Sequence, residues 1–398
     1  MKIALVSPAS LPATQFGGIM FLALDIAKQL SKKGENMTIY TTDLDFANNP
    51  STFNKNLPRE ERIENFTIKR SHVLLKFALY FVNPGMKKQM MDDEIDIIHT
   101  FGIRSYQSYI AAIISKKKNI PLIISDQSGL TTHPDLKEKG NLFKILYFFQ
   151  KPFLNYIIKQ SSKIIVANEY ESQIFEKFAG KSKISIVKNG IDLEELSSNI
   201  DFKKKYNINE KIILFLGRFN KVKGVDVLIN AIKILEEKNE VKNLKFLIMG
   251  VDFGFEKEMD ELIQRLNLTN LIMVIKKPSR EDVISAYKSC EFLVLPSRWE
   301  LSPLTPLEGF AFKKTIISSD VHGIPYTLEN KENCILIEPD NSELLAESIN
   351  KLSSDEKEYT KLGEAGFNFV KNVGNSVNMA QNTLDVYKQV LQNYNNQD

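Results

Sequence analysis

The chain has 398 residues, of which 43% are hydrophobic and 25% charged, and its formal net charge is +3. This length suits two domains, and the composition is that of a globular protein, which excludes a largely disordered chain. Residues 1–200 carry 26 Lys and Arg against 20 Asp and Glu, and the remainder carries 26 against 29. The basic first half could bind an anionic acceptor or an anionic membrane. The alternative is that its charges only form an ordinary solvated surface.

Apolar run lengths and cysteines bear on the compartment. No run reaches the roughly 18 apolar residues that a membrane span requires. The opening MKIALVSP has an apolar core too short for a signal peptide and predicts a first β-strand. Cys290 and Cys334 both adjoin apolar runs, so we expect reduced core residues rather than a disulfide. These features predict a cytoplasmic protein, with membrane contact left open.

The first half of the chain alternates short apolar runs with helical periodicity. Gly17-Gly18 separates the first strand from a helix over Ile19–Lys33, which Gly34 ends. Further helices are expected at Ser105–Lys116 and Glu171–Phe178. The predicted strands are Lys2–Ser7, Met37–Thr41, Thr67–Val73, Ile97–Thr100, Leu122–Ser125, Lys163–Ala167 and Ile184–Val187.

The second half begins a new series of alternating strands and helices. Strands are predicted at Lys211–Leu216, Leu244–Met249, Leu271–Ile275, Phe292–Leu295, Thr315–Ser318 and Ile335–Ile337. Helices are predicted at Val225–Glu237, Lys257–Leu266, Arg280–Lys288 and Ser342–Leu352. Such alternation predicts two doubly wound α/β domains with parallel sheets, residues 1–195 and 196–376, with a last helix at about 377–398 packing back on the first domain.

Chemistry in a doubly wound sheet is expected just after the strands, and the segment PSRWELSPLTPLE is the strongest candidate. It places Glu300 and Glu308 eight residues apart, between a buried strand and a helix. Carboxylates accept hydrogen bonds from sugar hydroxyls, and a helix N-terminus offers N–H groups to phosphate. The alternative is a capping box, with Thr305 as N-cap, Pro306 at the first helical position and Glu308 at the third.

Three further segments also follow predicted strands. Arg218 and Lys223 suit a diphosphate, because arginine offers a planar fork and lysine a point charge; the alternative is two solvated loop residues. Gly17-Gly18 permits close backbone approach to a ligand, or makes only a turn. Lys188–Asp192, KNGID, contains the turn-forming pair Asn-Gly.

In this order, the motifs resemble the retaining glycosyltransferases with the GT-B fold, family 4 (glycosyl transferases group 1). The resemblance spans nearly the whole chain, from KIALVSP and the glycine pair through VKNGID, GRFNKVKGVDVLINAIKIL and LKFLIMG to SREDVISAYKSCEFLVLPSRWE and the second glutamate. It implies two Rossmann-like domains facing across a cleft, retention at the anomeric carbon and no required metal or separate cofactor. The nucleoside-diphosphate sugar, UDP- or GDP-linked, is then a substrate.

The resemblance also implies roles for particular residues. Arg218 and Lys223 hold the donor diphosphate, and Glu300 lies beside the donor sugar. Glu308 accepts hydrogen bonds from the ribose. The remaining implied donor-binding positions are Gly17 and Gly18 near the diphosphate and acceptor, Gly250 and Met273–Pro278 near the base, and Leu304 and Thr305 at the helix start.

Departures from the family pattern leave questions open. Where members read EGFGL, this chain has Glu300-Leu301-Ser302-Pro303-Leu304, and Pro303 lacks an N–H. The donor sugar is therefore in doubt. Many members have a histidine after the strand that corresponds to Leu122–Ser125. Here Asp126 and His133 are the two candidates for its place, and His99 is either a cleft residue or a hydrogen-bonded strand-end histidine.

Residues 137–163 contain many aromatic and aliphatic residues with six lysines and one glutamate. They fit an amphipathic helix at a membrane surface, or helices packed on the domain core with lysines outside. Asp43-Leu44-Asp45 matches the DxD pattern of single-domain, metal-dependent glycosyltransferases, which leaves a second domain unexplained. Cysteine and histidine spacing typical of a metal site is absent from the sequence.

The predicted function is transfer of a hexose-type sugar from a nucleoside-diphosphate sugar to a glycan or lipid-linked acceptor. The alternatives are a nucleotide-sugar epimerase or hydrolase on the same fold, and a non-catalytic nucleotide-sugar binding protein. A dinucleotide oxidoreductase is disfavoured because no GxGxxG follows a strand. Nothing in the sequence indicates a nucleic-acid partner.

Overall fold

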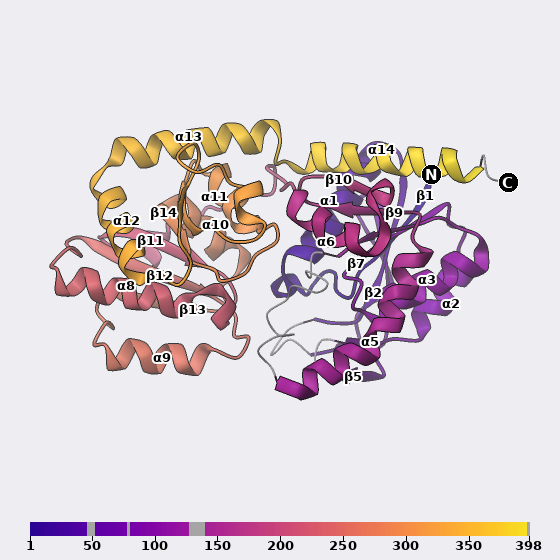
Figure 1. Ribbon diagram of the computed structural model, residues 1–398, viewed down its shortest axis with the longest axis horizontal. Coiled ribbons are helices and arrows are strands. Elements are labelled where there is room, and N and C mark those ends of the chain that lie inside the picture. Colours follow the sequence, from indigo (N-terminus) through magenta and orange to yellow (C-terminus); the bar gives the residue numbers. More distant parts are fainter. Residues whose placement is uncertain (46–51, 78–79, 127–139, 396–398) are drawn as a thin grey trace. The chain divides into compact units, whose positions relative to one another are not determined.

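The computed structural model describes residues 1–45, 52–77, 80–126 and 140–395, without the side chains of 140–148 and 395. Contacts between Cα atoms divide the chain into two compact units, which are described one by one (Figure 1). Unit 1 is Met1–Gly190 together with Ser376–Asp398, and unit 2 is Ile191–Asn375.

Unit 1 is built on an eight-stranded sheet in the order β10-β9-β8-β7-β1-β2-β4-β3. All neighbouring strands in it are parallel except β3 and β4. A separate antiparallel hairpin consists of β5 and β6. The strands are β1 Lys2–Val6, β2 Asn36–Thr42, β3 Glu60–Ile63, β4 Phe66–Ser71, β5 Leu75–Phe77, β6 Tyr80–Val82, β7 Ile97–Phe101, β8 Leu122–Ser125, β9 Lys163–Val166 and β10 Ile184–Ile186.

The helices of unit 1 include one from the end of the chain. Helix α14, Ser376–Asn395, packs beside α1, Gly18–Lys32 (Figure 1). The Gln29 amide donates to Ser376 Oγ over 3.1 Å between these helices. The other helical segments are η1 Thr14–Phe16, α2 Gly85–Asp92, α3 Tyr106–Lys118, α5 Gly140–Gln160, α6 Glu169–Ala179 and η2 Lys181–Lys183.

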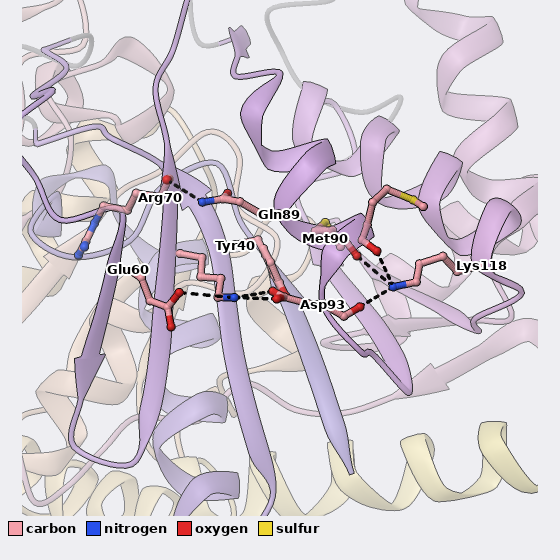
Figure 2. A network of polar contacts seen from close by, with 9 residues as sticks. Tyr40, Glu60, Arg70, Gln89, Met90, Asp93 and Lys118 are labelled. Carbon is pink, nitrogen blue, oxygen red and sulfur yellow. Dashed lines mark hydrogen bonds and ion pairs between the residues drawn. The ribbon is translucent and has the colours of Figure 1, made fainter.

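A polar network ties strands β2 and β4 of unit 1 to α2 and α3 (Figure 2). Asp93, just after α2, accepts from the Tyr40 hydroxyl at 2.5 Å and from Lys69 Nζ at 2.7 Å. Lys118, the last residue of α3, donates to the carbonyls of Met90 and Asp93. The free carbonyls at the end of α2 are thereby satisfied by a cation, which also favours the negative end of the helix dipole.

Unit 2 contains a six-stranded, fully parallel sheet in the order β13-β12-β11-β14-β15-β16. Its central strand, KIILFL, is buried over four consecutive residues because helices cover both faces. Successive strands run outward from β11 on one side and then from β14 on the other. The strands are β11 Lys211–Leu216, β12 Leu244–Gly250, β13 Ile272–Lys276, β14 Cys290–Leu295, β15 Ile316–Ser319 and β16 Ile335–Ile337.

Helices alternate with these strands, so unit 2 is a second doubly wound domain, as predicted. They are α7 Phe202–Tyr206, η3 Lys221–Lys223, α8 Val225–Glu237, α9 Glu256–Arg265, α10 Arg280–Ser289, α11 Leu304–Ala311, η4 Ile324–Tyr326, α12 Ser342–Ser354 and α13 Glu356–Asn372. Cys290 and Cys334 are both buried and unbridged, and burial raises the pKa of each thiol to about 12. Within the described ranges, no helix combines the length and apolarity needed to cross a membrane.

Candidate functional site

The strand order of unit 2 reverses direction between β11 and β14. Strands β12 and β13 follow on one side of this pair, and β15 and β16 follow on the other. Loops leaving two neighbouring strands at such a point diverge to opposite faces, which opens a crevice at the carboxyl ends where ligands bind. Arg218 follows β11 by two residues, and Glu300 follows β14 by five.

Close backbone packing brings the two loops together. Gly224, between η3 and α8, has φ +68°, and a Cβ there would lie 1.9 Å from the Pro296 carbonyl oxygen. The Arg298 amide donates to the Val222 carbonyl at 2.8 Å. The Arg298 guanidinium binds both carboxylate oxygens of Asp226 at 2.8 Å each. This bidentate pair, which no sequence pattern predicted, fixes the loop after β14 to the start of α8.

Lys223 and Glu300 meet within this braced crevice. Lys223 Nζ lies 2.5 Å from Glu300 Oε1, and the Ser297 hydroxyl donates to the same oxygen at 3.0 Å. The Glu300 side chain is 7% exposed and that of Lys223 24% exposed. The structure therefore brings together two of the residues that the sequence singled out, although 77 positions separate them.

Arg218 belongs to the same cluster. Its guanidinium carbon lies 4.3 Å from the centroid of the Phe253 ring, a cation–π geometry. Burial lowers the pKa of Arg218, and the charge of Glu300 acts in the opposite direction. Two cations with one carboxylate leave a net positive site at the strand ends, which suits an anionic ligand such as a diphosphate. The alternative of two solvated loop residues does not describe these side chains.

The capping-box alternative for Thr305 and Glu308 is wrong. Helix α11 begins at Leu304 with Pro303 in the N-cap position, and no described side chain caps it. Thr305 is therefore the second helical residue. Prolines at positions 303 and 306 lack an N–H, so the first turn presents the amides of Leu304 and Thr305. A helix start of this kind can hold an anion.

Glu308 belongs to a second cluster on the same unit. Its carboxylate lies 2.7 Å from Arg280 Nη1 and accepts from the Tyr287 hydroxyl at 2.9 Å. Both partners come from α10, and Tyr287 is buried. Arg280 and Tyr287 were not predicted from the sequence, where the one signal was that Arg280 starts a helix after a predicted strand. The carboxylate is held by two donors and retains lone pairs for ribose hydroxyls.

Gly250 lies where β12 leaves the sheet beside β11. A Cβ at this position would lie 1.8 Å from the carbonyl oxygen of Gly217, the residue before Arg218. The Gly250 carbonyl also accepts from the Lys277 amide at 2.8 Å, which closes the turn after β13. A glycine is required here by close backbone packing that sets the position of Arg218.

The glycine pair of unit 1 begins helix α1. Gly17 is the N-cap at φ 104°, a backbone conformation that favours glycine, and Gly18 is the first helical residue. Gly18 is exposed, and no described side chain caps this helix. The first backbone N–H groups of α1 are therefore not capped by a described side chain, and the role of the glycine pair stays a prediction.

His99 is a buried, hydrogen-bonded residue of unit 1. Its ring nitrogens lie 2.7 Å from the Tyr387 hydroxyl and 2.9 Å from Ser125 Oγ. Burial lowers the pKa of His99 to about 3, so the ring is neutral near pH 7. It borders a cavity of about 20 Å³ within unit 1, large enough for about one water molecule. His99 is therefore a hydrogen-bonded histidine near a strand end, which is one of the two alternatives considered from the sequence.

Two other candidate residues of unit 1, Asp126 and Asp43, accept hydrogen bonds from backbone amides. Asp126 is buried and accepts from the Ile103 amide at 3.3 Å. His133 lies outside the described residues. Asp43, the first residue of the DxD pattern, is buried, accepts from the Val73 amide at 3.1 Å and contacts His72. These contacts fix the position of the Asp43 carboxylate.

Solved structures identify the architecture of the chain. The HepE protein of Anabaena, crystallised with UDP and glucose, has a TM-score of 0.76 to this chain and 18% identity, over 98% of this chain and 99% of that one. Together with the two doubly wound units, this likeness defines a GT-B fold of two Rossmann-like domains, which confirms the predicted fold class.

Matches to sequence families identify the protein family to which the chain belongs. The model of glycosyl transferases group 1 matches residues 197–369, and that of glycosyltransferase family 4 matches residues 16–195. An uncharacterized glycosyltransferase of Methanocaldococcus jannaschii is 31% identical over 78% of this chain and 82% of its own length. The chain therefore belongs to the group 1 glycosyltransferases, in family 4, and is a glycosyltransferase.

A relative with a more specific name is the UDP-Gal:alpha-D-GlcNAc-diphosphoundecaprenol alpha-1,3-galactosyltransferase of Escherichia coli. It is 23% identical over 73% of this chain and 76% of its own length. Its name describes a UDP-linked donor and an acceptor carried on a polyprenyl diphosphate.

Proposed function

We propose that the enzyme transfers a hexose-type sugar from a UDP- or GDP-linked donor to a glycan or lipid-linked acceptor, with retention of anomeric configuration. The observation that carries the proposal is the convergence of Arg218, Lys223 and Glu300 at the point where the strand order of unit 2 reverses. The HepE complex with UDP and glucose supports the donor class, and the polyprenyl-diphosphate acceptor of the Escherichia coli relative supports the acceptor class.

Charge explains how this cluster would act on the donor. Cleavage of the bond between the sugar and the phosphate leaves negative charge on the diphosphate and positive charge on the sugar ring. Arg218, Lys223 and the amides of Leu304 and Thr305 supply donors for the departing diphosphate. Glu300 accepts from a sugar hydroxyl, and Lys223 exchanges its partner from Glu300 to a phosphate oxygen. Glu308 accepts hydrogen bonds from the ribose hydroxyls. The roles of Gly17, Gly18 and Gly250 and the cytoplasmic location stay predictions.

Turnover assays test this proposal. The protein is incubated with UDP- and GDP-hexoses, with and without a short polyprenyl-diphosphate sugar, and products are followed by NMR. We expect an α-configured glycoside from an α-linked donor. Release of free sugar that does not depend on acceptor supports a hydrolase, and an epimerised donor supports an epimerase. Product of inverted configuration contradicts retention. Binding without turnover supports a non-catalytic protein.

Matched lysine variants locate the chemistry. Lys223→Ala should lower kcat/KM by roughly 10²- to 10³-fold, the usual loss when one donor to developing charge is removed. Lys221→Ala is the control, because Lys221 lies two residues away in the same 3-10 helix, 65% exposed and paired with Glu258. Equal losses in the two variants would contradict the assignment of Lys223 to the diphosphate.

A further inference from the structure

The most exposed large apolar side chains of the described residues gather on one part of unit 1. Leu74, Leu75 and Phe77 of the β5–β6 hairpin are 63–69% exposed, and Phe149 of α5 is 66% exposed. Phe153, one turn further along α5, is 48% exposed. Single exposed apolar residues are ordinary, but several at such exposure within two elements indicate an interaction surface.

Aromatic contacts connect the two elements through helix α3. The rings of Tyr80 in β6 and Tyr106 in α3 lie 6.5 Å apart edge to face. One turn along α3, the Tyr109 ring lies 5.1 Å from that of Phe153 and 5.9 Å from that of Tyr156. The hairpin, α3 and α5 accordingly lie side by side (Figure 1). We call this the aromatic face: Leu74–Phe77, Tyr80, Tyr106, Tyr109, Phe149 and Phe153.

Tyrosines are suited to the boundary between water and lipid. The rings of Tyr80, Tyr106 and Tyr109 are partly exposed, so each combines an apolar body with a polar hydroxyl at the surface. On α5, Leu154, Ile157 and Ile158 are buried against unit 1. Phe149 and Phe153 therefore extend the apolar character of the helix to its solvent side.

Charge selects the partner. Three sequence stretches carry the aromatic face, namely residues 72–91, 101–125 and 140–168. They contain eleven Lys and Arg and no Asp or Glu. The exposed Lys76 and Lys151 lie within one or two residues of the exposed phenylalanines. Exposed apolar and aromatic side chains next to exposed lysines, in stretches that lack acidic residues, complement an anionic lipid surface, because the apolar side chains insert while the lysines attract the head groups.

We propose that the aromatic face docks unit 1 on an anionic lipid bilayer, with the exposed side chains of Leu74–Phe77, Phe149 and Phe153 inserted among the head groups. It extends the segment 137–163 considered from the sequence by adding the β5–β6 hairpin and the tyrosines of α3. The biological purpose of docking rests on the proposed function, since it would bring the enzyme to a lipid-linked acceptor. The docking itself uses no residue of the candidate donor site.

Vesicle co-sedimentation of the full chain tests the proposal. The probes are vesicles of phosphatidylcholine mixed with phosphatidylglycerol and vesicles of phosphatidylcholine alone, without donor or acceptor. The wild type should bind the mixed vesicles and bind the neutral ones several-fold more weakly. Lys76→Gln with Lys151→Gln should weaken binding by about fivefold per lysine.

Apolar variants decide whether the aromatic face is responsible. Leu75→Ser with Phe77→Ser, and separately Phe149→Ser with Phe153→Ser, should each weaken vesicle binding by at least roughly tenfold. Phe178→Ser with Ile186→Ser is the matched control, because these side chains are exposed on α6 and β10 of the same unit. All substituted residues are exposed, and the melting temperature of each variant verifies folding.

Several outcomes would overturn the proposal. These are no binding of the wild type, equal binding to neutral vesicles, or equal effects of the test and control variants. A mass that depends on concentration and falls in the apolar variants, without vesicle binding, would identify a second copy of the chain as the occupant instead. Nucleoside-diphosphate binding is measured in parallel on the same variants. If the wild type does not bind a nucleoside diphosphate, that result counts against the proposed function and leaves the vesicle result unaffected.

Discussion

Two buried ionisable side chains of unit 1 have pKa values shifted in opposite directions. Burial raises the pKa of Glu171 to about 7, while the Ala167 amide, which donates to it at 2.7 Å, acts to lower it. Burial lowers the pKa of His99 to about 3. In both cases the folded state favours the neutral form, so Glu171 costs stability as pH rises and His99 costs stability as pH falls.

Glu171→Gln should therefore stabilise the protein mainly above neutral pH. Between the unfolded pKa of about 4.5 and the folded pKa of about 7, the folded state binds more protons, and stability falls as pH rises. Glutamine can still accept from the Ala167 amide but carries no charge. By 1.36 kcal/mol per pKa unit, the gain at pH 8 should approach about 3 kcal/mol and vanish near pH 4.5. Urea unfolding at the two pH values measures it. The same difference at both would contradict the assigned ionisation.

His99→Gln should flatten the acid side of the stability profile. The unfolded state binds a proton to this residue below about pH 6.5, whereas the folded state does so only near pH 3. Stability is thus lost as pH falls through this window, at up to about 1.36 kcal/mol per pH unit. Melting temperatures of wild type and variant at pH 6.5 and 5 measure the slopes. Parallel slopes would show that His99 is not the group that titrates.

At the residue scale, the sequence predicted those candidate site residues that lie just after strands of a parallel sheet. Arg218, Lys223 and Glu300 could be singled out because each lies between a buried strand of a parallel sheet and the helix that follows it. Arg280 and Tyr287 were not found, because their meeting with Glu308 depends on how α10 packs against α11. Neither spacing nor periodicity along one segment contains that information.

Among the elements, the start of α8 depends on one glycine. Gly224→Ala should cost more than the roughly 1 kcal/mol expected for a left-handed backbone, since its Cβ would also displace the Pro296 carbonyl and the loop to Glu300. Gly254→Ala is the control, with φ +93° and nothing within 4 Å of its Cβ. Urea unfolding measures both. Equal costs would mean that the contact with Pro296 is easily relaxed.

Regular elements with a clear period were predictable, and several others were not. The strands of unit 2 and helix α8 match the predicted ranges to within two residues. Helix α13 was missed because Gly363 and Gly366 weaken its helical pattern, yet they allow close packing on the Lys313 carbonyl and the Phe310 ring. The segment before β11, for which no helix was predicted, contains the short helix α7, which Asp201 caps. The start of α11 was misplaced because a proline, not Thr305, occupies the N-cap.

For the whole molecule, the chain returns to unit 1 through α14 after completing unit 2. The Tyr387 hydroxyl contacts His99, and Met379 and Thr383 border the cavity beside it. Deleting residues 376–398 should therefore lower hydrogen-exchange protection in α1 and β7 and leave β11 and β14 of unit 2 protected. Uniform loss of protection in both units would contradict this division of the stability.

The fold class was the most predictable property, because two separate series of alternating strands and helices specify two doubly wound sheets. The donor, the acceptor and the lipid contact depend on a few side chains and on ligands, which fold alone does not specify.

The central claim is that unit 2 binds a nucleoside diphosphate at Arg218, and a thermal-shift titration with UDP, GDP, ADP and NAD tests it most directly. A ligand at about a hundred times its dissociation constant should stabilise the protein by about 2.7 kcal/mol. We expect UDP or GDP to do so, with the effect lost in Arg218→Ala and kept in Arg265→Ala, an exposed arginine of α9. Stabilisation by NAD alone, or equal stabilisation of both variants, would contradict the account.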